Sequence, residues 1–514
     1  MKRELSDRTR YSMRNASIAM ATKILAIVFG FFSRMMFTHT LTMQYAGING
    51  LFTNIVGALN MADLGISTAL VYSIYEPVAR RDIPKQQALM KLFERIYIII
   101  AGITLILGVM MFPVLRTIMN DANEVQGVML IYALFLARTV FSYFMMYRSM
   151  IFIANQRNYV NDVADSACLV AQNTIQMIIL YLTGNYILYL IIYVVMVLVR
   201  NICIYFRAEH DYPEVFQKNV NVLSREEEKG IFRNMRAMLM HKIGTVVINN
   251  IDNLTLTGIV GIISVGMYSN YYLIIGSIRQ IMDRIVNAIA GSVGNLGAIE
   301  HRDSVREVFL GTLFVVAAGY GTAAIGLYEI LDMFVGASFG SNYVFPKIVT
   351  MVLCLNLFLN GIRQASLIFR DSLVLFWHDR YKTIIESIVN LVFSVILARR
   401  FGAAGVFIGT TVSIVGISMW VEPMVLYKDF FKVPVKEYFL RSGKYCTQFF
   451  AAWFITDRLI QMISWNSDIT RYFGIIIICM IIPPLFLVAL NGRSEEMCIV
   501  LSHLNLMGKG TADE

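Results

Sequence analysis

The chain has 514 residues, of which 57% are hydrophobic and only 15% are charged, with a formal net charge of +9. Soluble globular domains carry about 45–50% apolar and about 25% charged residues. The composition therefore excludes disorder, disfavours soluble enzymes and nucleic-acid-binding proteins, and predicts an all-α, polytopic membrane protein.

Apolar runs that match the length of a membrane span follow one another along the chain. A helix needs about 20 predominantly apolar residues to cross a hydrocarbon core of about 30 Å. The second and eighth runs are longer, so we expect each to extend beyond the bilayer, to tilt, or to bend near Gly57 and Gly276. We predict about fourteen spans, near 16–37, 45–75, 91–112, 126–147, 163–183, 186–206, 237–257, 262–294, 307–328, 344–369, 382–398, 402–426, 445–463 and 472–490.

The connections between these runs alternate sharply in charge. About 30 of the 44 basic residues fall on one side of the predicted membrane and about six on the other. The positive-inside rule then places both termini in the cytoplasm, which requires an even number of spans. Arg399 and Arg400 fall on the sparsely charged side, which makes the run at 382–398 the weakest predicted span.

The two halves of the chain resemble each other. A shift of 219 residues without gaps lays Lys23 on Lys242 and Gly57 on Gly276. Six spans separate the copies, so both halves run in the same sense as a parallel repeat. We predict an N-terminal six-helix lobe, a cytoplasmic linker, a C-terminal six-helix lobe, and two further helices with a tail, at 1–206, 207–236, 237–427 and 428–514.

Basic residues also lie inside the predicted spans. Each costs about 2.5–3.5 kcal/mol at the membrane centre, unless it is paired, reaches the interface or lines a hydrated cavity. Candidate partners are the acids Asp63, Asp165, Asp252 and Asp283, the last lying one turn after Arg279. The basic residues are Lys23, Arg34, Arg95, Arg138, Lys242, Arg279, Arg284 and Arg363.

Polar stripes run along several of the same spans. They indicate either interhelical hydrogen bonds or a wet central pathway, and their presence in both halves favours the pathway. A pathway with an excess of cations suits an anionic substrate such as a phosphate. The asparagines of these stripes are Asn49, Asn60, Asn249, Asn253, Asn356 and Asn360.

The segment Tyr45–Asp82, YAGINGLFTNIVGALNMADLGISTALVYSIYEPVARRD, closely resembles the start of bacterial polysaccharide flippases of the O-antigen type. These belong to the multidrug/oligosaccharidyl-lipid/polysaccharide (MOP) exporter superfamily. Typical relatives have Glu-Leu-Gly-Ile where this chain has Asp63-Leu64-Gly65-Ile66. The resemblance implies two parallel, MATE-like lobes around a V-shaped cavity that opens alternately to each side of the bacterial cytoplasmic membrane.

The same resemblance implies a substrate and a site. The substrate would be an undecaprenyl-diphosphate-linked oligosaccharide, moved from the cytoplasmic to the outer leaflet. Asn253 occupies the shifted position of Arg34, so the charged site is not strictly symmetric. The implied cavity residues are Lys23, Arg34, Lys242, Arg279 and Arg284, to which we add Arg138 and Arg363 as substrate-binding candidates.

Several functions remain open from the sequence. A lipid II flippase is the nearest alternative, and a cation-coupled multidrug antiporter would give a role to Asp63 or Asp252. A polytopic glycan polymerase or acyltransferase would need a large outer loop or clustered histidines and carboxylates, and the sequence has neither. We therefore expect no enzyme activity, no metal and no cofactor beyond a coupling ion, Na⁺ or H⁺, or the membrane potential alone.

The expected partners follow from the flippase hypothesis. They are the lipid-linked oligosaccharide, membrane lipids, and glycan polymerase and glycosyltransferases, with no nucleic acid. We expect the protein to function as a monomer.

Overall fold

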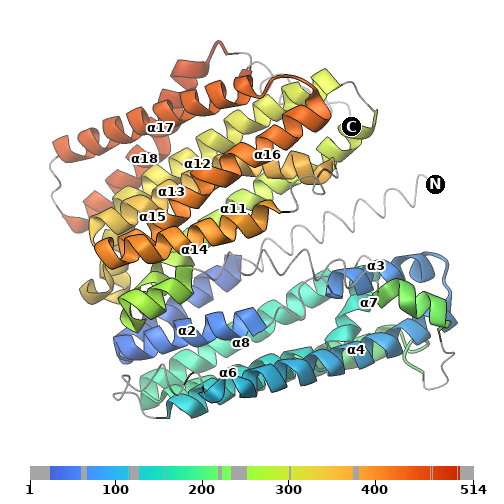
Figure 1. Cartoon of the computed structure of the whole chain (residues 1–514). Helices are drawn as coiled ribbons and strands as arrows, with labels where there is room; N and C mark the ends of the chain where they lie inside the picture. The colour runs from blue at the N-terminus through green and yellow to red at the C-terminus, as the bar shows by residue number, and fades with distance from the viewer. Residues whose placement is uncertain are drawn as a thin grey trace. The chain divides into compact units, whose positions relative to one another are not determined.

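The computed structural model describes residues 24–59, 66–113, 115, 127–155, 157–217, 223–232, 252–299, 302–373, 375, 381–463, 465, 467–494 and 496–497. These residues form helices and connections and contain no strand. The chain divides into two compact units, Met1–Asn250 and Ile251–Glu514, which are described separately (Figure 1).

Unit 1 is built around α9, which packs against α6 and α8. A 41° bend separates α6 from the short helices that follow it, at Phe144 and Met145. The described helices are Ile24–Thr40, α2 (Met43–Leu59), α3 (Ile66–Ala79), α4 (Ile83–Met110), α6 (Val128–Tyr143), η2 (Met146–Arg148), α7 (Ser149–Ala154), α8 (Tyr159–Thr183) and α9 (Tyr186–Asp211).

Unit 2 is centred on α12 and α13, which pack against each other and against α11. The last two helices, α17 and α18, pack on α12. The elements are η3 (Leu256–Val260), α11 (Ile262–Ile299), α12 (Arg302–Phe339), η4 (Ser341–Tyr343), α13 (Lys347–Ser372), α14 (Lys382–Phe401), α15 (Ala403–Ser413), η5 (Ile414–Ser418), α16 (Met419–Val425), η6 (Leu426–Phe431), α17 (Lys436–Met462) and α18 (Asp468–Asn491).

Local sequence signals explain where several helices begin. The first N–H groups of a helix have no partner within it, and a polar side chain just before the helix satisfies them. The Asn185 side chain accepts hydrogen bonds from the N–H groups of residues 187 and 188 at the start of α9. Asp82 caps α4, and Ser467 forms a capping box with Thr470 at the start of α18.

Seven helices of the described chain are long and apolar enough to cross a membrane, or eight if the bent pair that begins with α6 is one span. Large apolar side chains such as Ile98, Ile99 and Ile106 on α4 are exposed, as expected for a surface that faces lipid. The helices α11, α14 and α17 are also long enough but are more polar or more charged. The predicted count of fourteen and the orientation of the termini stay predictions.

Helices occur wherever a predicted run falls within the described residues. The weakest predicted span, at 382–398, is helical as α14 and ends in Arg399 and Arg400. The eighth run forms one continuous helix, α11, through Gly276. The second run begins as α2 and resumes as α3, and residues 60–65 between them lie outside the description.

Small residues let α14 and α15 approach closely. A Cβ atom added to Gly409 would collide with Ser394 of α14, both with its backbone and with its side chain. The Ser394 hydroxyl also donates a hydrogen bond to the backbone carbonyl of Val406, at 2.9 Å. Close backbone approach through glycine and serine is typical of membrane helix pairs. This contact fixes α14 beside α15 and so positions the polar side chains described below.

Candidate functional site: charged side chains inside the two units

The described part of the chain contains four of the seven predicted substrate-binding side chains, Arg34 and Arg138 in unit 1 and Arg279 and Arg363 in unit 2. Arg284 lies on α11, but its side chain is outside the description. The other predicted residues outside the described ranges are Lys23, Asn60, Asp63, Lys242 and Asn249.

Arg279 is held by a carboxylate that other helices fix in place. Its Nε lies 3.6 Å from Oδ2 of Asp283, one turn along α11, and its side chain is 49% exposed. Oδ1 of Asp283 accepts hydrogen bonds from the Tyr320 hydroxyl of α12 and from Nε2 of Gln364 of α13, the latter at 3.2 Å. The three helices therefore set the position of Arg279 while leaving half of its surface accessible.

A glycine makes room for this arrangement. A Cβ atom added to Gly361 of α13 would collide with Cβ and the ring of Tyr320. The ring of Tyr320 is buried against α13, so its hydroxyl can reach Asp283 only if position 361 has no side chain. Gly361 thus influences the position of Arg279 indirectly, through Tyr320 and Asp283.

Arg363 belongs to a closed network of four charges, the charge ring, formed with Lys382, Glu386 and Glu422. Its Nε lies 2.8 and 2.9 Å from the two Glu422 oxygens, and Nη1 lies 3.2 Å from Glu386. Lys382 Nζ contacts Glu422 and lies 2.9 Å from Glu386. The two positive and two negative charges of the ring compensate one another. Arg363 is therefore paired with two carboxylates of the protein itself.

The other three members of the charge ring were not among the residues predicted from the sequence. Glu386 and Glu422 are 2% and 0% exposed, and Lys382 is 5% exposed. The i,i+4 spacing of Lys382 and Glu386, and one glutamate in the apolar run around Glu422, were the available signals. Counting these acids, the interior of unit 2 has no excess of cations among its described residues.

Asp252 is partnered by neutral groups. Oδ1 accepts a hydrogen bond of 2.8 Å from the Thr410 hydroxyl of α15, and Asn390 of α14 is a second hydrogen-bond partner. No basic side chain of the described residues lies within ion-pair distance of this carboxylate. Asp252 is therefore an acid without a compensating cation in this part of the chain.

One asparagine of the α13 stripe, Asn356, makes interhelical hydrogen bonds. Asn356 donates to the carbonyl of Phe407 at 2.9 Å and accepts from Thr411 at 2.7 Å. Asn360 Nδ2 donates to the Asn356 carbonyl at 2.9 Å. Asn356 thus joins α13 to α15, as expected for interhelical hydrogen bonds, the alternative to a wet pathway that the sequence left open, whereas the Asn360 contact lies within α13. The Asn253 carbonyl accepts a hydrogen bond of 2.8 Å from the Thr257 hydroxyl.

Arg138 of α6 is partnered by an aromatic ring rather than by a carboxylate of the described residues. Its guanidinium stacks over the Tyr193 ring of α9, with Cζ 3.7 Å from the ring centroid. Its Nε is buried and has no hydrogen-bond partner. No carboxylate of the described residues lies within ion-pair distance of Arg138. Asp165, a predicted partner, instead pairs with Arg200 at 2.6 Å.

A row of tyrosines on α9 includes the ring that contacts Arg138. Tyr186, Tyr189 and Tyr193 follow one face of α9 at positions i, i+3 and i+7. Arg34 lies over the Phe37 ring at 5.2 Å, and both arginines act electrostatically on the Tyr189 hydroxyl. We call this group the tyrosine–arginine cluster, which consists of Arg34, Arg138, Tyr186, Tyr189 and Tyr193.

A polar contact extends this cluster toward α2. The Tyr186 hydroxyl donates to Oδ1 of Asn49 at 2.9 Å. The Tyr186 ring also contacts the rings of Phe37 and Tyr45 edge-on, with centroids 5.5 and 5.2 Å apart. Four helices of unit 1 therefore contribute to one aromatic and cationic cluster, in which Tyr186 and Phe37 are buried.

The connector that follows α9 is attached to unit 1. Residues 225–232 are helical, Ile231 is buried in the core of this unit, and Glu227 lies 2.8 Å from Lys85 of α4. The Lys85 ammonium holds the pKa of the Glu227 carboxyl below its usual value. α9 itself extends to Asp211, beyond the predicted start of the linker at residue 207.

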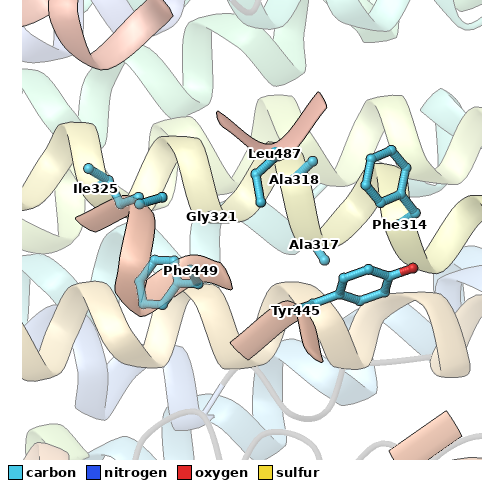
Figure 2. A pocket seen from close by; sticks show the side chains of 9 residues that line it. Phe314, Ala317, Ala318, Gly321, Ile325, Tyr445, Phe449 and Leu487 are labelled. Atoms are coloured by element: carbon cyan, nitrogen blue, oxygen red, sulfur yellow. The ribbon is translucent and has the colours of Figure 1, made fainter. Parts of the chain in front are cut away.

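An apolar cavity lies between α12, α17 and α18, as Figure 2 shows. Its volume is about 10 Å³, near the minimum that holds one water molecule. Its walls are apolar apart from the hydroxyl of Tyr445, so a substrate-sized ligand does not fit there. Its lining residues are Phe314, Ala317, Ala318, Gly321, Ile325, Tyr445, Phe449, Ala452 and Leu487.

No protein-family model matches the sequence, and no curated protein matches it. Solved structures do match. The inward closed lipid II flippase MurJ has a TM-score of 0.62 at 14% identity, covering 93% of this chain and 99% of MurJ. An inward-facing multidrug resistance MATE family transporter of the MOP superfamily has a TM-score of 0.57 at 12% identity, covering 80% and 98%. This chain has the fold of MOP transporters.

A third MOP-fold neighbour, the eukaryotic MATE transporter AtDTX14, has a TM-score of 0.55 at 14% identity, covering 86% of this chain and 99% of its own. These neighbours are transporters and not enzymes. They confirm the predicted all-α, MATE-like fold of a multi-pass membrane protein, and at such identities they say nothing of the substrate.

Proposed function

We propose that the protein is a flippase that moves an undecaprenyl-diphosphate-linked oligosaccharide from the cytoplasmic to the outer leaflet of a bacterial cytoplasmic membrane. The MOP fold supports a transporter, and the MurJ neighbour, a lipid II flippase, supports a lipid-linked substrate. The resemblance of Tyr45–Asp82 to polysaccharide flippases supports an oligosaccharide.

The observation that carries the proposal is the guanidinium of Arg138. It lies about ten residues into an apolar helix, where a charge is costly, and it has no carboxylate partner among the described residues. Charges inside membrane spans face the bundle interior or a water-filled cavity, and they commonly mark the path of a substrate or an ion. An anionic substrate provides that compensation, whereas a cationic drug would be repelled.

The proposed mechanism uses two kinds of contact. The polyprenyl tail stays in the bilayer, while the diphosphate binds arginines such as Arg279, whose position is set by Asp283. The lobes then close on the cytoplasmic side and open outward. An anion that leaves a negative-inside cell gains about 2.3 kcal/mol per charge per 100 mV, so the membrane potential favours export.

Asp252 is the candidate for coupling to Na⁺ or H⁺. Its carboxylate receives only neutral hydrogen-bond donors in the described structure, from Thr410 and Asn390. A bound cation would compensate this buried charge. The same observation favours the second candidate function, a cation-coupled multidrug antiporter.

The experiment is a reconstitution of the full chain in proteoliposomes with three substrates. We expect translocation of an undecaprenyl-diphosphate-linked oligosaccharide that is faster at an inside-negative potential. Translocation of lipid II alone would identify a lipid II flippase, and transport of a cationic dye alone would identify an antiporter. Either result would overturn the proposal. The proposal also includes that the protein functions as a monomer and that it associates with glycan polymerase and glycosyltransferases.

A further inference from the structure

An open cavity lies at one end of unit 2, where η6 is followed by α17. Its volume is about 590 Å³, within the range of pockets that bind small ligands. Three of its lining side chains are cationic and one is acidic, and the others are apolar. We call it the basic cavity, and its lining includes Arg306, Pro434, Lys436, Glu437, Leu440 and Arg441.

A tight turn between η6 and α17 forms one wall of the basic cavity. Lys432 follows η6 in the left-handed conformation, and its N–H donates to the Tyr427 carbonyl at 2.8 Å. Pro434, two residues later, has no N–H group with which to continue a helix. α17 then begins at Lys436, so the turn brings the first residues of α17 to the cavity.

Glu437 fixes the two arginines of the basic cavity. Its Oε2 accepts hydrogen bonds from Nε and Nη2 of Arg306 of α12, at 2.9 and 2.6 Å. Its Oε1 accepts from Nη2 of Arg441, one turn along α17, at 3.0 Å. The side chains of Arg306 and Arg441 remain 31% and 21% exposed. One carboxylate therefore positions guanidinium groups from two helices and leaves both of them partly accessible.

The basic cavity keeps an excess of positive charge. Lys436 is exposed, and no carboxylate of the described residues lies within ion-pair distance of its ammonium. Arg441 has a second carboxylate partner in Glu496, which is buried. Three cations therefore face two carboxylates, Glu437 and Glu496, so one positive charge is left over. A ligand with a single negative charge compensates that excess.

An apolar surface adjoins these cations. Leu440 is 64% exposed and lies one turn after Lys436, on the same face of α17 and about 6 Å farther along it. Trp420 of α16, also exposed, contacts Phe439 with ring centroids 4.5 Å apart. Tryptophan is enriched where a membrane meets water, and the charge pattern places the start of α17 on the cytoplasmic side. The basic cavity therefore has cations at the level of lipid headgroups and an apolar residue deeper in.

We propose that the basic cavity binds the headgroup of an anionic phospholipid of the inner leaflet, one with a single phosphodiester such as phosphatidylglycerol. The phosphate accepts hydrogen bonds from Lys436 and the two arginines, and an acyl chain contacts Leu440. Basic pockets at the cytoplasmic ends of membrane helices suit acidic headgroups. The bound lipid would tie α17 to α12. The inference does not rest on the proposed function, because its ligand is a component of the bilayer and not the transported substrate.

The chemistry of the cavity favours this ligand over two others. A free phosphate has no apolar part with which to contact Leu440. A zwitterionic lipid such as phosphatidylethanolamine brings an ammonium group to a cavity that already has an excess positive charge. An anionic phospholipid uses both the cations and the apolar residue.

The test is a lipid titration of the purified full-length protein in a neutral detergent, with bound molecules counted by native mass spectrometry. The probes are phosphatidylglycerol, phosphatidylethanolamine with the same acyl chains, and glycerol 3-phosphate. We expect phosphatidylglycerol to bind at least about tenfold more tightly than phosphatidylethanolamine, which lacks the net charge, and than glycerol 3-phosphate, which lacks the chains.

Variants of exposed residues on α17 then assign the site. Lys436→Gln is expected to lower phosphatidylglycerol affinity about fivefold, the effect of one basic residue near an anionic headgroup. Lys444→Gln, the matched control, removes an exposed lysine two turns along α17 that does not line the cavity, and should lower the affinity by less than about twofold. Leu440→Asn should weaken phosphatidylglycerol binding and leave glycerol 3-phosphate binding unchanged. An unchanged thermal midpoint shows that each variant is folded.

Three results would overturn the inference. Equal affinities for phosphatidylglycerol and phosphatidylethanolamine would mean that the acyl chains alone determine binding. Equal losses in Lys436→Gln and Lys444→Gln would mean that the lipid responds to the overall charge of the protein and not to this cavity. Binding of glycerol 3-phosphate as tight as that of phosphatidylglycerol would assign the cavity to a soluble anion.

Discussion

The charge ring gives the most quantitative prediction. Glu422 is fully buried and accepts from Nε of Arg363 at 2.8 and 2.9 Å and from Lys382. Glu422→Gln leaves two cations facing the single carboxylate of Glu386. Breaking a buried ion pair by removal of one partner costs about 3–5 kcal/mol, because an uncompensated charge remains in a medium of low polarity.

The assay is unfolding of the detergent-solubilised protein by titration with a denaturing surfactant, which gives a free energy of unfolding. We expect Glu422→Gln to lower it by about 3–5 kcal/mol. The double variant Lys382→Met with Glu422→Gln removes one charge of each sign, and we expect it to recover at least half of the loss.

The control is an exposed ion pair on the same chain. The side chains of Arg80 and Glu76 are 76% and 65% exposed and lie 2.9 Å apart. Glu76→Gln should cost no more than about 1 kcal/mol, because solvent screens this pair. The claim that the charges of the ring compensate one another would be refuted by either of two results. One is a loss of unfolding free energy in Glu422→Gln as small as that of the control. The other is a double variant as unstable as the single one.

Three further predictions concern other contacts. Gly361→Ala should displace Tyr320 and weaken the binding of pyrophosphate to the purified protein by several-fold, measured by NMR titration. Tyr320→Phe, which removes only the hydroxyl, should give a smaller loss of pyrophosphate affinity in that titration. The lowered pKa of Glu227 means that its contact with Lys85 is present at neutral pH and is lost when acid protonates the carboxyl. The hydrogen-exchange protection factors of residues 225–232, which are corrected for the intrinsic effect of pH on exchange, should therefore fall in acid. Glu227→Gln should make these protection factors low and independent of pH. Ser467→Ala should lower the free energy of unfolding by about 0.5–2 kcal/mol, measured by the same surfactant titration, because α18 loses its capping box.

The helices could be predicted from the sequence because the apolar runs are long and the charges between them are strong signals. α14 was the weakest predicted span, since Arg399 and Arg400 contradicted the charge pattern; the segment is helical, but it is more charged than the seven helices that are apolar enough to cross a membrane. The π-helical turn η5 between α15 and α16 and the bend at Met145 were not predicted, because single residues in an apolar run do not reveal a local change of helix type.

The interior charges were only partly predictable. The i,i+4 pair Arg279 and Asp283 could be inferred because both residues lie on one helix. The partners of Arg363 come from α14 and α16, so only the three-dimensional packing brings Glu422 and Glu386 to it. The excess of cations predicted throughout the spans is consequently absent from the described interior of unit 2, and Arg138 of unit 1 becomes the decisive residue.

The most direct test of the central claim is translocation of an undecaprenyl-diphosphate-linked oligosaccharide by proteoliposomes with Arg138→Gln. The account predicts that the rate falls at least about tenfold relative to the unsubstituted protein, while Arg200→Gln, the control on α9, stays unchanged. An unchanged rate in Arg138→Gln would contradict the claim that an anionic substrate compensates this charge.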